Sequence, residues 1–95
     1  MTTAVNSPET TTSNPADDTI DMLRGQIDAL DAALLRIVAE RARVSRRIQT
    51  ARMNAGGTRV ELGRERTVRN TYRDGVGPDG AALAEAVLQV CRGAR

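Results

Sequence analysis

Apolar residues recur at steps of three and four along the first half of the chain. This apolar stripe predicts one long helix that buries a single face. The positions of the stripe are Ile20, Leu23, Ile27, Leu30, Leu34, Ile37, Arg41, Val44, Ile48 and Ala51. Arg41 occupies a position where the pattern calls for a large apolar residue. Because a guanidinium keeps its proton and is costly to bury unpaired, Arg41 needs either a fixed acidic partner or a pocket that binds an anion.

The ends of the long helix are marked by polar residues and glycines. Residues 1–17 are rich in Thr, Ser and Pro, and we expect them to form a disordered N-terminal tail that precedes a helical domain at 18–95. Asp18 or Thr19 can cap the helix. The helix is expected to stop at about Asn54, where two glycines follow.

Two shorter helices are predicted after the long one. The first spans about Val60 to Asp74, and the glycines between 75 and 80 end it. Asp79 can cap the second, and Gly93 is its expected stop. No segment has the alternating pattern of a strand, so the fold class is all-α, with one long and two short helices.

The long helix is too long for one chain to cover. From residue 20 to 54 it measures about 52 Å, whereas a compact chain of this size has a diameter of about 32 Å. A second copy must then bury the rest of the apolar stripe. We expect an antiparallel homodimer of long helices, the simplest closed arrangement.

Composition excludes several functions. The 95 residues carry 14 basic and 12 acidic side chains, with one tyrosine and no tryptophan or phenylalanine. That small net charge and the lack of aromatic platforms disfavour a nucleic-acid partner. Cys91 is the lone cysteine and histidine is absent, so we expect no metal site and no internal disulfide. With no signal peptide or membrane span visible, we expect a cytoplasmic protein without a membrane partner.

Several charged residues are spaced to form an anion site. Arg41 and Arg52 lie eleven residues apart, hence on nearly the same helix face and about 16 Å apart along the axis. Arg24 lies on a different side and can reach the same ligand only across a dimer. On the second helix, Glu61, Arg64 and Glu65 present acids beside a base. This set suits a dicarboxylate with a hydroxyl group, since arginines bind carboxylates and a glutamate accepts from a hydroxyl.

Other interpretations of these residues stay open at this stage. Arg41 can instead form a buried ion pair with Glu65 or with an acid of a second chain. Arg24 and Arg52 can form ordinary exposed ion pairs.

Taken together, the residues resemble the all-α chorismate mutase family, in particular its short stand-alone intracellular actinobacterial members. The resemblance rests on these short sequence segments: Leu23-Arg24, Ile27-Asp28, Leu30-Asp31, Leu34-Leu35, Ala39-Glu40-Arg41, Ala51-Arg52-Met53, Arg59-Val60 and Arg64-Glu65. The resemblance implies an intertwined three-helix homodimer. It further implies that chorismate is bound by Arg24 from the partner chain and by Arg41, Arg52 and Arg64 from the same chain, with Glu65 and the backbone near Glu61 at the hydroxyl.

The activity implied is the concerted rearrangement of chorismate to prephenate, for phenylalanine and tyrosine biosynthesis. It needs no nucleophile, metal or cofactor. Catalysis then rests on holding the substrate in a compact shape and on a fixed positive charge at the ether oxygen, where negative charge develops. The resemblance assigns that charge to Arg52, with Arg41 and Glu65 as the other catalytic residues.

The third helix departs from the family pattern. Relatives carry a polar residue, commonly glutamine, as a second donor to the ether oxygen, and here only Gln89 and Arg92 are possible substitutes. We therefore expect weak activity in isolation and activation by DAHP synthase, as in related short forms. The segment from Cys91 to Arg95 is the expected regulated element.

Three alternative functions stay open beside the mutase. A helical dimer without enzymatic activity would use its arginines as interhelical contacts. A duplex nucleic-acid binder would need a basic face, which the interspersed acids Asp28, Asp31 and Glu40 interrupt. A pyruvate lyase acting on isochorismate is found on similar scaffolds.

Overall fold

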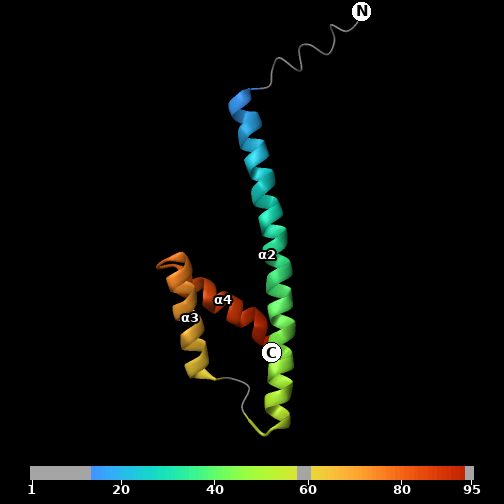
Figure 1. The fold of residues 1–95 in the computed structure, drawn as a ribbon, viewed down its shortest axis with the longest axis vertical. Helices are drawn as coiled ribbons and strands as arrows, with labels where there is room; N and C mark the ends of the chain where they lie inside the picture. The colour runs from blue at the N-terminus through green and yellow to red at the C-terminus, as the bar shows by residue number, and fades with distance from the viewer. Residues whose placement is uncertain (1–13, 58–60, 94–95) are drawn as a thin grey trace, which may run out of the picture. The chain divides into compact units, whose positions relative to one another are not determined.

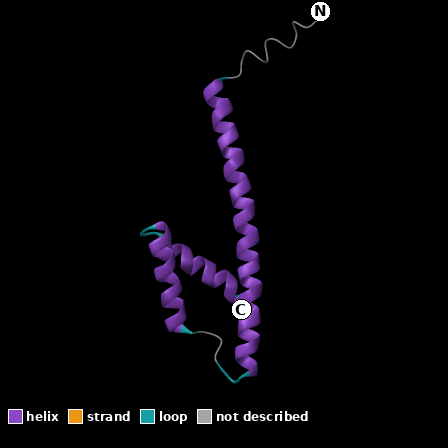
Figure 2. Ribbon diagram, in the orientation of Figure 1, coloured by secondary structure: helices purple, strands orange, loops and turns teal. Residues whose placement is uncertain are grey.

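A computed structural model describes residues 14–57 and 61–93 of the chain. These residues form three helices, α2 (Pro15–Asn54), α3 (Leu62–Val76) and α4 (Gly80–Arg92) (Figures 1 and 2). The described ranges contain no strand. The predicted order of one long and two short helices is confirmed. Residues 1–13 of the expected tail and the matching segment Arg59-Val60 lie outside the described residues.

Helix α2 begins four or five residues earlier than the predicted caps, Asp18 or Thr19, imply. Pro15 takes the first helical position, where its missing N–H is not needed. The side chain of Asn14 accepts a hydrogen bond from the backbone N–H of Ala16 at 2.8 Å and so caps the helix. The expected cap at Asp18 or Thr19 is therefore wrong. The Thr19 hydroxyl lies inside the helix and donates to the carbonyl of Pro15.

Helix α2 ends at the predicted place through a Schellman motif. Gly56 has a φ of 84°, which an L side chain rarely adopts. The N–H of Gly57 bonds to the carbonyl of Arg52 at 2.8 Å, and the N–H of Gly56 bonds to that of Met53 at 3.0 Å. The last turn of α2, which carries Arg52, is thereby held in a defined conformation.

Helices α3 and α4 form a packed pair. Helix α3 begins and ends two residues later than predicted, whereas α4 has Asp79 and Gly93 at its two caps as expected. The Asp79 side chain makes no capping hydrogen bond. Val68 of α3 packs with Ala84 and Leu88 of α4. Gly80 lets the two helices meet closely, because a Cβ at that position would lie 2.3 Å from the Tyr72 carbonyl oxygen.

The described part of the chain divides into two compact units, a first and a second, with the boundary between Leu35 and Arg36. In the second unit, Ala42 of α2 forms a small core with Val87 and Cys91 of α4, and Tyr72 of α3 packs against it. In the first unit the apolar stripe is open to solvent, with Leu30 65% exposed. None of the helices in the described ranges has the length and apolar character that a membrane span requires.

Candidate functional site

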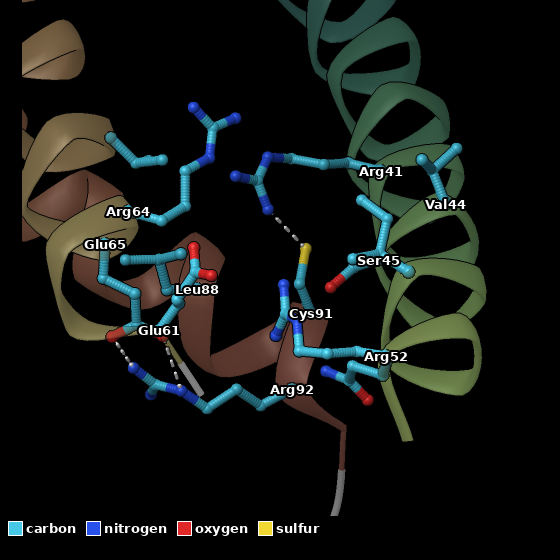
Figure 3. Close-up of a pocket in the computed structure, with 13 residues that line it drawn as sticks. Arg41, Val44, Ser45, Arg52, Glu61, Arg64, Glu65, Leu88, Cys91 and Arg92 are labelled. Carbon is cyan, nitrogen blue, oxygen red and sulfur yellow. Dashed lines mark hydrogen bonds and ion pairs between the residues drawn. The ribbon is translucent and has the colours of Figure 1, made fainter. Parts of the chain in front are cut away.

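The second unit contains a pocket between its three helix segments. Its volume is about 230 Å³. The lining combines charged groups with an apolar floor: Arg41, Val44, Ser45, Ile48, Gln49 and Arg52 come from α2, Glu61, Arg64, Glu65 and Val68 from the start of α3, and Leu88, Cys91 and Arg92 from α4 (Figure 3). Four arginines therefore face one small space, which strongly favours an anionic ligand.

Arg41 is the arginine of the apolar stripe, and its contacts within this chain test the predicted ion pair with Glu65. Its guanidinium donates a hydrogen bond to the sulfur of Cys91 at 3.0 Å. The alternative ion pair with Glu65 does not form within the described chain, where the carboxylate pairs with Arg92 and Arg69. Arg41 thus contacts a neutral acceptor and keeps its charge available to the pocket.

Glu65 is the buried acid of the pocket, with 8% of its surface exposed. Arg92 donates to both of its carboxylate oxygens, from Nη2 at 2.5 Å and from Nε at 3.2 Å. Arg69 lies 3.7 Å from the same carboxylate and also bonds to Glu85. The hydrogen bond from Arg69 is the main cause that lowers the pKa of Glu85 below its ordinary value of 4.5.

Arg52 lines the pocket from the last turn of α2. Its side chain lies directly against Gly57, since a Cβ at position 57 would be 2.7 Å from the Arg52 Cγ. Because Gly57 has no Cβ, the Arg52 side chain can occupy this space. The turn after α2 therefore both ends the helix and leaves space for the Arg52 side chain.

Arg64 and Glu61 stand at the start of α3 and both line the pocket. In Figure 3 the side chains of Arg41 and Arg64 extend toward each other from α2 and α3. The structure thus brings together all the sequence-predicted site residues of α2's second half and of α3.

Two predicted residues lie elsewhere. Arg24 belongs to the first unit, where it is exposed and does not line the pocket. Gln89 lies on the exposed side of α4 and donates to Glu85 at 3.4 Å. Of the two third-helix candidates, the pocket of this chain includes Arg92 and does not include Gln89.

Sequence reasoning missed two polar residues of the lining. Ser45 and Gln49 face the pocket between Arg41 and Arg52. Their spacing of four and eight residues after Arg41 places them on the same helix face, so the helical period was a sufficient signal. The contact between Cys91 and Arg41 was not predicted, because no local pattern connects the two residues.

The arrangement can bind a small molecule with more than one negative group. Arginines on α2 and α3 approach the pocket from two sides, and a buried carboxylate on α3 can accept from a hydroxyl. Preorganised positive charge beside an apolar floor also stabilises charge that develops during a reaction.

Comparison with known proteins agrees with this chemistry. Residues 23–92 match the family described as chorismate mutase type II, which is most of the chain. The chain belongs to the chorismate mutase type II family. The resemblance drawn from the sequence is thereby confirmed.

Two relatives within this family have the same descriptive name. The chain is 43% identical over 86 residues to the intracellular chorismate mutase of Mycolicibacterium smegmatis, an alignment that covers 90% of this chain and 80% of that protein. It is 49% identical over 74 residues to the intracellular chorismate mutase of Mycobacterium tuberculosis, covering 78% of this chain and 70% of that one.

A solved chorismate mutase structure has a similar fold. It is described as a non-covalent complex of DAHP synthase and chorismate mutase from Corynebacterium glutamicum with a bound transition state analog. The TM-score is 0.81 at 35% identity, and the match covers 86% of this chain and 99% of that one. The three-helix fold is therefore that of the chorismate mutase type II family.

Proposed function

We propose that this protein is a chorismate mutase that converts chorismate to prephenate. The observation that carries the proposal is the convergence of Arg41, Arg52 and Arg64 on one pocket that also contains the buried acid Glu65. Chorismate has two carboxylates and a hydroxyl, so its polar groups match the charges of this pocket. Membership of the chorismate mutase type II family supports the same reaction.

In the proposed mechanism the side chains bind and orient the substrate and take no proton from it. Arg41 and Arg64 bind carboxylate groups, and Glu65, with the backbone near Glu61, accepts from the hydroxyl. Arg52 supplies the positive charge at the ether oxygen as the C–O bond breaks. Holding the flexible substrate in its reactive shape removes much of the entropic part of the barrier.

The active form is proposed to be an antiparallel, intertwined homodimer. Along α2 the stripe residues Ile27, Leu30 and Ile37 are 56%, 65% and 64% exposed in the single chain. Exposed apolar side chains in a continuous row are typical of a surface that a partner buries. In such a dimer Arg24 of one chain can complete the pocket of the other, which explains why it does not line its own.

DAHP synthase is the proposed activating partner. The support comes from the Corynebacterium glutamicum chorismate mutase, whose structure is described as a complex with that enzyme. We expect the isolated protein to have weak activity. Arg92 of α4 is a candidate for the second donor to the ether oxygen, but it already donates to Glu65 within the pocket. The relatives named intracellular support a cytoplasmic location.

The reaction is tested by following the loss of chorismate absorbance and the formation of prephenate with the purified protein. Arg52→Ala is expected to lower turnover on the order of a hundredfold or more, since one preorganised donor contributes about 3–4 kcal/mol. Arg47→Ala, an exposed arginine of α2 outside the pocket, is the matched control. Absence of chorismate consumption, with and without DAHP synthase, would exclude the mutase. Release of pyruvate from isochorismate in its place would indicate the lyase.

A further inference from the structure

The last turn of α4 touches both of the other helices at the pocket. Cys91 accepts a hydrogen bond from Arg41 of α2, and the next residue, Arg92, donates to Glu65 of α3 (Figure 3). Cys91 is 2% exposed, so its side chain is almost fully enclosed by its neighbours. We propose that Cys91 is a positioning residue that orients Arg41 for chorismate, an inference that rests on the proposed function.

The chemistry of the thiol suits this role. A neutral sulfur is a weak acceptor, so it restrains the guanidinium without cancelling its charge. A carboxylate at the same place would form an ion pair and compete with the substrate. Because an arginine loses side-chain freedom when it binds a ligand, a contact that orders Arg41 beforehand reduces that entropic cost.

The position of the sulfur is set by apolar packing. Cys91 forms a core cluster with Val87 of α4 and Ala42, the residue that follows Arg41 on α2. The same side chain therefore joins α4 to α2 and places an acceptor beside Arg41. Loss of packing and loss of the acceptor must be separated in any test.

The test compares steady-state constants for chorismate in the full chain. Cys91→Ala removes the acceptor and is expected to raise KM about three- to tenfold, the range of one neutral hydrogen bond, with turnover changed less than about twofold. Cys91→Ser retains an acceptor and is expected to keep KM within about twofold of the unchanged protein. Val87→Ala removes packing from the same cluster without touching the pocket, so it is expected to lower the unfolding midpoint and leave KM unchanged.

A double-mutant cycle with Arg41→Lys separates positioning from general structure. If Cys91 acts through the guanidinium, Cys91→Ala raises KM in the unchanged protein and has no further effect in the Arg41→Lys background. An equal increase in both backgrounds would overturn the inference. So would a Val87→Ala variant whose KM rises as much as that of Cys91→Ala.

The two proposals fail in different ways. An active parent protein whose KM is unaffected by Cys91→Ala refutes the positioning role and leaves the mutase standing. A parent protein that does not consume chorismate refutes the proposed function, and the role of Cys91 falls with it.

Discussion

Arg92, in the last turn of α4, donates two hydrogen bonds to the carboxylate of Glu65 on α3, at 2.5 and 3.2 Å. The bidentate geometry is the strongest that an arginine and a carboxylate form. Because Glu65 is buried, this pair both neutralises the acid and anchors the end of α4 to the pocket. The contact makes Arg92 a supporting partner of Glu65 within the isolated chain.

Arg92→Ala is expected to lower the free energy of unfolding by about 1–3 kcal/mol, because a buried carboxylate loses its main partner and keeps only Arg69 at 3.7 Å. Denaturant unfolding followed by circular dichroism measures this. Arg43→Ala is the control: it breaks the exposed pair with Glu40, which contributes less than about 1 kcal/mol. Equal losses in the two variants would mean that burial of Glu65 has no energetic consequence.

Gly57→Ala is expected to lower turnover about tenfold or more while KM changes less. A methyl group there would lie 2.7 Å from the Arg52 Cγ, so the side chain must shift, and small displacements of a catalytic group are costly. Gly63→Ala is the control, because nothing lies within 4 Å of an added Cβ at that position of α3. Steady-state kinetics check both variants. Full turnover in Gly57→Ala would show that the position of the Arg52 side chain beside Gly57 does not matter for catalysis.

Mixing two inactive variants tests whether the site is shared between chains. Arg24→Ala and Arg52→Ala are each expected to have very low activity. When they are refolded together, half of the dimers are mixed and each mixed dimer has one intact site, so about one quarter of the parent activity returns. Chorismate consumption by the mixture, compared with each variant refolded separately, measures this. If the mixture is no more active than its components, the site is not shared between chains in the proposed way. Arg24 and Arg52 would then act in the same chain's site, or one of them would lie outside the site.

The dimer itself is tested by Leu30→Asp, which puts a charge into the apolar stripe. Leu30 is 65% exposed in the single chain, and a two-fold dimer would bury both copies. The dimer is therefore expected to weaken by on the order of 5 kcal/mol. Sedimentation should then give a monomer mass, whereas Arg36→Asp, outside the stripe, should remain dimeric. A Leu30→Asp protein that sediments as a dimer would contradict the proposed interface.

Much of the helix pattern was predictable from local residues. The stop after Asn54 followed from two glycines, and the caps of α4 at Asp79 and Gly93 from turn residues. The start of α2 was predicted too late, because Asn14 and Pro15 looked like part of a polar tail although they make a good helix start. In both cases the deciding interactions lie within a few residues along the chain.

The sequence by itself determined that α2 carries an apolar stripe interrupted by Arg41, and that Arg52 lies on nearly the same face of that helix. Helical periodicity is enough for this, because each residue's direction follows from its position along the helix. Only the tertiary structure decided which partner each charge has: Cys91 for Arg41, and Arg92 for Glu65. Those partners are 50 and 27 residues away along the chain, and their meeting depends on how α4 packs against α2 and α3, which no local pattern encodes.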